Sequence, residues 1–482
     1  MTFIRKVKTK SGATAIQIVR KQAGRIVSLQ HLGSAHTKIE MQALLALARD
    51  QLHRNQLSLF PEKKPSVLRL RLRRSSSDLL FRVLNQQYLK LGLGELQDPD
   101  FAYLCAARMV EPTSKLDSLR VLADLGITGL TKDRLYRCLS RIVANNYRVL
   151  IQNACFAAAA SQALTLVLYD VTTLYFEIQK EDAYRKSGLS KERRLEPQIV
   201  IGLLVDQTGF PLSVQSFEGN MAETKTILPV LEAFSRRHHL SNITVVADAA
   251  MMSLRNLQAL TQAGYTYIVG SRLNKIPYAI ADYRKTQALT DQQIVVDTHQ
   301  EFRIIYQYRA KRAALDLRNI QKQITKAQNV VSGRIPAHRA KFVTMTTKKK
   351  SLNQKLIDKA YALAGIKGYV TNLTAPDDQI VAAYHQLFQV EASFRMAKSD
   401  LKARPIFHWK REAIEAHLTV VLAALAVGRR VESRSQMSLK QLIKILRPIR
   451  SGVIVLNGQE YFAQEEISED IHILLEKLGV GH

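Results

Sequence analysis

Two short apolar runs in the middle of the chain each close on an aspartate. LTLVLYD ends at Asp170 and NITVVAD ends at Asp248, 78 residues later. Short runs rich in Val, Leu and Ile are typical of buried strands. A carboxylate that borders such a strand is costly unless a partner compensates its charge. The pattern therefore predicts a sheet with a polar site at one edge.

The segments around these runs alternate between strand and helix periodicity. Between residues 164 and 272 the pattern predicts the order β-β-β-α-β-α-β, with the turn DQTG (206–209) joining the second and third strands. If the first and fourth strands are neighbours in a mixed sheet, their ends bring Asp170 and Asp248 together. We therefore expect an α/β fold with a mixed sheet.

A third carboxylate lies on a predicted helix from Asp378 to Leu401. On a helical wheel Glu391 falls in the middle of the apolar stripe. The charge has two possible partners: a salt bridge to Arg395 or Lys398, or a divalent cation. The helix by itself favours the salt bridge.

Taken together, the three carboxylates favour a metal site. Three such groups at one point repel each other, and two Mg²⁺ ions about 4 Å apart relieve that repulsion. A site of this kind transfers phosphoryl groups. The sequence contains no GxGxxG or GxxxxGK[ST] motif, which argues against a nucleotide-binding α/β enzyme.

The net charge indicates the class of partner. Seventy Lys and Arg residues against 41 Asp and Glu residues give a formal charge of +29. A chain this basic most often binds nucleic acid, although a solvated basic surface without a dedicated partner is the alternative. Three scattered cysteines form no CxxC pair and suit a reducing compartment. The apolar stretch Leu418 to Val427 is too short for a membrane span. We expect no membrane role and a cytoplasmic, nucleoid-associated location.

The chain divides into six expected parts. Residues 1–33 alternate apolar and polar side chains and predict a β-meander. Between Lys275 and Ala364, 18 Lys and Arg residues stand against 6 Asp and Glu residues. The expected parts are a DNA-binding β-meander and helix (1–66), a helical DNA-binding region (67–160), the first part of a catalytic core (161–271), a basic insertion (272–366), the second part of the core with the Glu helix (367–431), and a C-terminal region (432–482).

The motifs resemble those of DDE transposases of bacterial insertion sequences, in the IS-four superfamily that includes the Tn-five type. The resemblance runs from about residue 100 to residue 430. Its segments are ARMVEPTSKLDSLRVL (107–122), LYDVTTLYFE (168–177), GLSKERR (188–194), QIVIGLLVDQTGFPLSVQSFEGNMAETKT (198–226), VVADAAMMSLRNLQAL (245–260) and YHQLFQVEASFRMAKSDLKARPIFHWKREAIEAHL (384–418). The resemblance implies an RNase H-like catalytic core that an insertion interrupts between the second Asp and the Glu.

The resemblance also implies roles for individual residues. Asp170, Asp248 and Glu391 become the catalytic triad that binds two Mg²⁺ ions, for which Mn²⁺ can substitute. The family signature around the Glu is Tyr-x2-Arg-x3-Glu-x6-Lys. Tyr384, Glu391 and Lys398 match it, whereas Leu387 occupies the Arg position and receives no role. The implied DNA-binding residues are Tyr384, Arg395, Lys398, Lys191, Arg193 and Arg194, with Arg395 expected to replace the missing Arg.

The expected function is that of a DNA transposase. Metal-bound water cuts a strand at each end of an insertion sequence, and the freed 3′-OH attacks target DNA. The expected partners are double-stranded DNA, as transposon ends and as target, and a second copy of the chain in an active homodimer. Two alternatives stay open: a related RNase H-like metal-dependent endonuclease, and a catalytically silent DNA-binding protein descended from a transposase.

Overall fold

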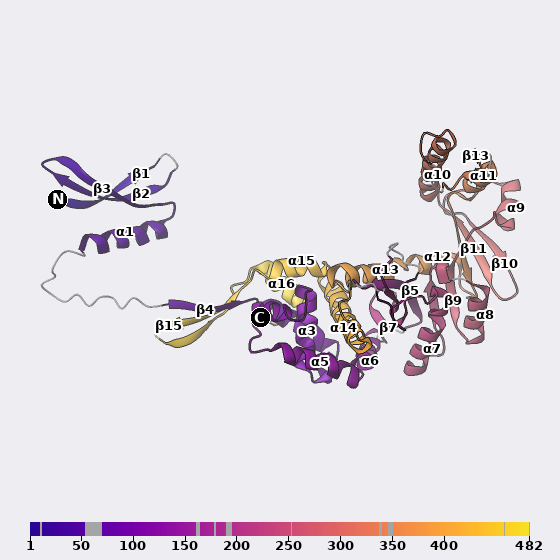
Figure 1. Cartoon of the computed structure of the whole chain (residues 1–482), viewed down its shortest axis with the longest axis horizontal. Coiled ribbons are helices and arrows are strands. Elements are labelled where there is room, and N and C mark those ends of the chain that lie inside the picture. Colours follow the sequence, from indigo (N-terminus) through magenta and orange to yellow (C-terminus); the bar gives the residue numbers. More distant parts are fainter. Residues whose placement is uncertain are drawn as a thin grey trace. The chain divides into compact units, whose positions relative to one another are not determined.

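The computed structural model describes residues 1–9, 12–53, 70–160, 164–177, 180–188, 195–251, 253–336, 340–345, 350–456 and 458–481. It divides into two compact units (Figure 1). The first unit holds residues 1–70 with 456–458, and its described part forms an antiparallel sheet with a helix on it. Its elements are β1 (Thr2–Lys8), β2 (Thr14–Gln22), β3 (Arg25–Ala35) and α1 (Lys38–His53). These three strands form a sheet in the order β1-β2-β3. The rest of the segment 1–66, after residue 53, lies outside the described residues.

Helices open the second unit, as the periodicity of residues 78–160 predicts. Asp98 accepts hydrogen bonds from the amides of Asp100 and Phe101 at the start of one helix, and Thr131 accepts one from Arg134 at the start of another. Such side chains satisfy amides that lack a partner within the helix. The helices are α2 (Asp78–Lys90), α3 (Pro99–Val110), α4 (Ser118–Asp124), α5 (Lys132–Ala144) and α6 (Tyr147–Ala160).

A large mixed sheet forms the centre of the second unit. In the described residues its strand order is β10-β11-β14-β9-β8-β5-β6-β7. The first five expected strands are β5 (Leu166–Tyr175), β6 (Gln198–Val205), β7 (Pro211–Glu218), β8 (Thr244–Ala247) and β9 (Thr266–Ser271). β5 runs parallel to β8 and antiparallel to β6, and β8 runs parallel to β9. The predicted mixed sheet, with the first and fourth strands as neighbours, is confirmed.

Helices cover both faces of this sheet. Val167, Tyr169 and Val171 join one core with α7 (Ile227–His238) and α8 (Leu254–Gln262). Leu168 and Leu174 belong to a second core with α12 (Asp377–His385), α13 (Phe388–Arg395) and α14 (Arg411–Ser435). Because side chains alternate along a strand, every even-numbered residue of β5 faces the second core.

Strand β5 is longer than the sequence predicts. Asp170 lies in its middle, not at its end, because β5 pairs with β6 as far as Tyr175, opposite Gln198. The pairing with β8 stops earlier, at Tyr169 opposite Ala247. Asp170 therefore marks the end of the parallel pairing only. Thr172 lies buried within the strand instead of closing it.

The single helix expected from Asp378 to Leu401 is not continuous. The amides of Gln386 and Leu387 donate to the carbonyls three residues earlier and tighten the chain into a turn between α12 and α13. A π-helical segment, Met396–Asp400, follows α13. The turn breaks the 3.6-residue period. Glu391 is consequently exposed, and its neighbour Val390 takes the buried position.

The basic segment 272–366 contributes to the central sheet. Its strands β10 (Ile294–Thr298) and β11 (Arg303–Tyr308) join β14 (Ile366–Thr371) at the edge of the sheet. Its remaining described elements are α9 (Tyr278–Thr286), α10 (Ala310–Val331), β12 (Val343–Met345), β13 (Lys350–Leu352) and α11 (Gln354–Leu363). This segment thus extends the sheet and adds a small core of its own on α10 and α11.

The C-terminal region completes the helical part and a small sheet. β4 (Leu70–Ser76), in the part 67–160 that was expected to be helical, is a strand and pairs with β15. The remaining elements are α15 (Leu439–Leu446), β15 (Ser451–Leu456), β16 (Gln459–Ala463) and α16 (Glu469–Leu478). None of the helices in the described residues combines the length and apolar character that a membrane span requires.

Candidate active site

The register of β5 and β8 brings two of the predicted carboxylates side by side. Tyr169 pairs with Ala247, so Asp170 and Asp248 each follow the last pair of the parallel ladder. Both residues have the parity of Leu168 and Val246, which face the core under α12–α14. Asp170, within β5, and Asp248, directly after β8, are therefore neighbours in the register of the two strands.

The helices α12 and α13 cross this face. α12 packs against β8 and β9, and α13 packs against β5 and β6. Glu391 in α13 is exposed, as is Asp248, whereas Asp170 is half-buried. The third predicted carboxylate thus comes from the element that covers the other two.

Asp248 receives two hydrogen bonds on one oxygen. The Tyr384 hydroxyl donates to Asp248 Oδ1 at 3.3 Å, and the Ala249 amide donates to the same oxygen at 2.7 Å. The Tyr384 side chain is buried, and burial together with the charge of Asp248 raises the pKa of its hydroxyl, so it stays a donor. Gly270 leaves the space for it, because a Cβ there would lie 2.6 Å from the Tyr384 oxygen.

Lys367 is a functional candidate that the sequence did not indicate. Its Nζ lies 4.3 Å from the centre of the Tyr384 ring and 5.7 Å from that of Tyr369. Burial and then Arg312 lower the pKa of Lys367, while Asp248 and Glu391 act in the opposite direction. The ammonium group is thus close to both carboxylates. Lys367 begins the sequence KGYVTNL, most of which forms β14, and nothing in that sequence distinguishes this lysine from the others. The order of strands in the sheet brings β14 to this site, and the sequence does not show that order.

The three carboxylates do not form a closed metal centre in this structure. Among the described residues, no three His, Cys, Asp or Glu side chains gather closely enough to hold a metal ion. The donor chemistry fits a divalent cation, because Mg²⁺ prefers carboxylate oxygens. The adjacent pair of Asp170 and Asp248 supplies two such ligands. Glu391 lies on the helix that covers this face, and both Asp248 and Glu391 act on Lys367.

The residues predicted to contact DNA do not form one cluster in the described part of the chain. Lys398 lies beside Thr172 of β5 around a cavity of about 30 Å³, and Arg395 is exposed in the last turn of α13. Lys191, Arg193 and Arg194 lie outside the described residues. Tyr384 is buried against Asp248, and a side chain in that position offers little surface to DNA.

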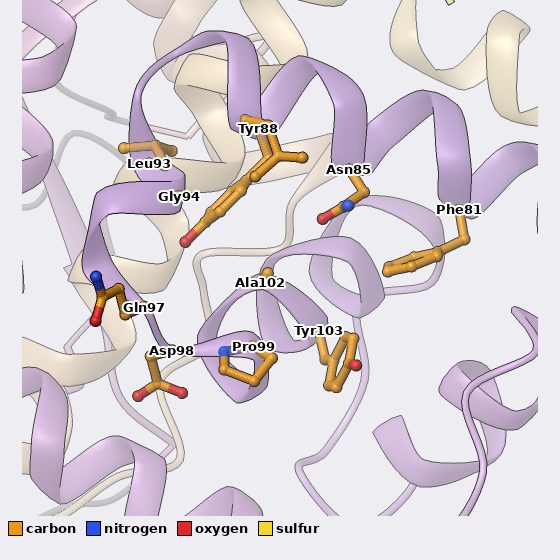
Figure 2. Close-up of a pocket in the computed structure, with 11 residues that line it drawn as sticks. Phe81, Asn85, Tyr88, Leu93, Gly94, Gln97, Asp98, Pro99, Ala102 and Tyr103 are labelled. Carbon is orange, nitrogen blue, oxygen red and sulfur yellow. The ribbon is translucent and has the colours of Figure 1, made fainter. Parts of the chain in front are cut away.

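A pocket between α2 and α3 is not a second active site. Figure 2 shows Phe81, Tyr88 and Tyr103 around it, with Asp98 at the start of α3; its volume is about 350 Å³. The Asp98 carboxylate is occupied by Arg141, at 2.8 Å, and by the Tyr147 hydroxyl, at 3.0 Å. Burial alone would raise the pKa of Asp98, but these hydrogen bonds outweigh it and lower the pKa. The carboxylate anchors helices.

The segment that carries this site matches a known protein family. Residues 162–427 match the transposase DDE domain, which is more than half of the 482 residues. The chain belongs to the DDE transposase family. The matched residues of this DDE domain include Asp170, Asp248 and Glu391, together with all the elements from β5 to β14.

One solved structure resembles the chain at low similarity. The piggyBac transposase synaptic complex with hairpin DNA has 11% sequence identity and a TM-score of 0.42, and the alignment covers 77% of this chain and 79% of that chain. No curated protein sequence matches the chain.

Proposed function

We propose that this DDE transposase-family chain cuts the ends of an insertion sequence and joins them to target DNA. The observation that carries the proposal is the register of β5 and β8, which sets Asp170 beside Asp248 within the family domain. The strands β7-β6-β5-β8-β9, with their first two neighbour pairs antiparallel and the next two parallel, support an RNase H-like core.

Each reaction in this proposal is a phosphoryl transfer. Water attacks a phosphodiester at each transposon end, which leaves a free 3′-OH, and that hydroxyl then attacks a phosphodiester of target DNA. Asp170 and Asp248, with Glu391, would hold two divalent cations, Mg²⁺ or Mn²⁺. When bound, these cations would activate the nucleophile and stabilise the leaving oxygen.

The surrounding residues position this chemistry. Tyr384 orients Asp248 through its hydrogen bond, and we now assign it this role in place of a DNA contact. Lys367 offsets the negative charge of the carboxylates. Lys398 and Arg395 are proposed to contact DNA phosphates, with Arg395 acting for the Arg that Leu387 replaces. Lys191, Arg193 and Arg194 remain proposed DNA contacts.

The remaining expectations concern partners and location. Double-stranded DNA is the proposed partner because the chain carries a net charge of +29. A homodimer is proposed for the active complex, since two ends must be cut together. A cytoplasmic location at the nucleoid, membership of the IS-four superfamily and the relation to the Tn-five type stay predictions.

The decisive experiment removes one carboxylate of the pair. Asp248→Ala is expected to bind DNA that contains the element's ends and to leave it uncut in Mg²⁺. Asp378→Ala is the matched control, because Asp378 is exposed in the first turn of α12. Cutting by Asp248→Ala at the rate of the control would refute the proposed site.

The same assay separates the two alternatives. An endonuclease would cut the DNA and yield no strand-transfer product. A silent DNA-binding protein would bind the ends and leave them uncut in both Mg²⁺ and Mn²⁺. Leu387 in place of the family Arg is the observation that favours the silent alternative.

A further inference from the structure

Four basic side chains gather away from the carboxylates. They are Arg108 in α3, Lys115 in the loop after it, His408 in the loop before α14, and His417 in the second turn of α14. Arg108 is 8% exposed, Lys115 7% and His417 4%, while His408 is half-buried. The rings of His408 and His417 lie 5.6 Å apart. α3 packs against α14, which explains how residues almost 300 positions apart meet.

This basic cluster lacks a compensating carboxylate. Among the described residues, the groups that act on Lys115 are Arg108 and the thiols of Cys105 and Cys138. Burial and then Arg108 lower the pKa of Lys115 to about 7. Burial, followed by Lys115 and Arg108, lowers the pKa of His408 to about 4. Buried cations without an anion are unfavourable, and an anion at this place would relieve the repulsion among them.

A cavity opens next to the cluster. It has a volume of about 520 Å³, and His408 lines it together with Arg137 and Ser140 of α5 and Lys410. Glu412 also lines it, so one carboxylate faces two cationic side chains and a hydroxyl in the cavity itself. Lys115 and Arg108 do not line the cavity, but both lie close enough to His408 to lower its pKa. The net positive charge around the cavity favours an anionic ligand, and the cavity has room for a phosphodiester.

The chain segment that leads to His408 is attached to the strand that carries Asp170. The amide of Ile406 donates to the Tyr175 carbonyl at 3.1 Å, which attaches the segment before His408 to the end of β5. Five residues of a strand span roughly 17 Å, which equals about five base pairs of duplex DNA. A duplex bound at the carboxylates would have to extend about five base pairs along β5 to reach the end of this strand.

We propose that this cavity is an anion site that binds a phosphate group of the DNA backbone, with Lys115 and Arg108 as its buried source of positive charge. The proposal rests on the proposed function, because DNA is the phosphate source that a transposase meets. The site holds DNA at a distance from the cut and takes no part in the chemistry.

The first test measures DNA affinity against salt concentration for Lys115→Met. Lys477→Met, at an exposed lysine in the last turn of α16, is the control. The cluster variant is expected to bind duplex DNA about tenfold more weakly. Its slope of log affinity against log salt should fall by about 0.9, the value for one phosphate. Affinity and slope equal to those of the control would overturn the proposal.

The second test measures thermal unfolding in inorganic phosphate and in chloride of equal ionic strength. Phosphate is expected to raise the Tm of the wild type and to leave that of Lys115→Met unchanged, while the variant in chloride is at least as stable as the wild type. Equal responses to phosphate would overturn the anion site. The Tm of the wild type alone could rise in phosphate while the variant keeps the wild-type slope of log DNA affinity against log salt. That result would show that the anion bound at this site is not a DNA phosphate.

A variant that fails to fold does not end the test. Lys410→Met removes an exposed cation at the cavity wall, and the same two measurements apply to it with the same expected losses. Failure of the proposed function is seen separately, as continued cutting by Asp248→Ala. Failure of the anion site leaves wild-type cutting and the loss in Asp248→Ala intact.

Discussion

One oxygen of Asp248 accepts both the Tyr384 hydroxyl and the Ala249 amide, so its carboxylate has a defined orientation. Tyr384→Phe removes one of these donors and keeps the ring that packs against Lys367 and Tyr369. We expect a drop of about tenfold in the rate of end cutting, the size of one charge-assisted hydrogen bond. Tyr361→Phe in α11, whose hydroxyl bonds Gln321, is the control. Cutting rates measured in Mg²⁺ decide the matter, and equal rates for the two variants would contradict the role.

A substitution at Gly270 provides a second test of the hydrogen bond between Tyr384 and Asp248. A Cβ at Gly270 would meet the Tyr384 oxygen at 2.6 Å, so Gly270→Ala must push that hydroxyl away from Asp248. We expect a loss of cutting similar to that in Tyr384→Phe. In the double variant the oxygen is absent and the clash disappears, so the two losses should not add. Additive losses in the double-mutant cycle would show that Gly270 acts through another contact.

At the scale of elements, Glu415 connects α14 to three other parts of the fold. It forms a salt bridge with Arg148 of α6 and accepts hydrogen bonds from Tyr184, at 2.7 Å, and from Ser216 of β7, at 2.8 Å. Burial alone would raise the pKa of Glu415. The charge of Arg148 and the two hydroxyls outweigh burial and lower the pKa below the usual value of 4.5.

The lowered pKa predicts how stability depends on pH. A carboxyl with a depressed pKa stabilises the fold above its unfolded pKa of 4.5, and this contribution is lost as the pH falls through the folded pKa. Glu415→Gln should cost about 2 kcal/mol at neutral pH and show a shallower loss below pH 4.5. Glu412→Gln, at an exposed position of the same helix, should behave as the wild type. Urea unfolding at several pH values measures both, and parallel curves for wild type and Glu415→Gln would contradict the prediction.

At the scale of the whole molecule, the chain consists of two compact units. Residues 1–69 carry 13 Lys and Arg residues against 3 Asp and Glu residues, a net charge of +10. A chain of residues 70–482 should keep the cooperative thermal unfolding of the second unit, because that unit contains its own cores. Its DNA affinity should depend less steeply on salt. Circular dichroism and a salt titration check the two results, and loss of the main unfolding transition would contradict the independence of the units.

Local patterns determined much of the fold and the pair of aspartates. Alternation predicted the β-meander, because a strand with one buried face has a period of two. Continuous apolar runs predicted β5, β6, β8 and β9, because strands buried on both faces are apolar throughout. The same runs indicated that Asp170 and Asp248 meet at one edge. The length of β5 was predicted wrongly, since its second half depends on pairing with β6 and not on its own residues. The family model confirms the class that the motifs suggested.

The sequence by itself determined the class of fold, the two adjacent carboxylates and the excess of positive charge, because composition and periodicity are properties of neighbouring residues. Only the tertiary structure decided which distant groups meet. The turn at Gln386 and Leu387 exposed Glu391, the sheet order brought Lys367 to Tyr384, and the packing of α3 on α14 buried Lys115 beside His408. These contacts join segments far apart in the chain, and no local period records them.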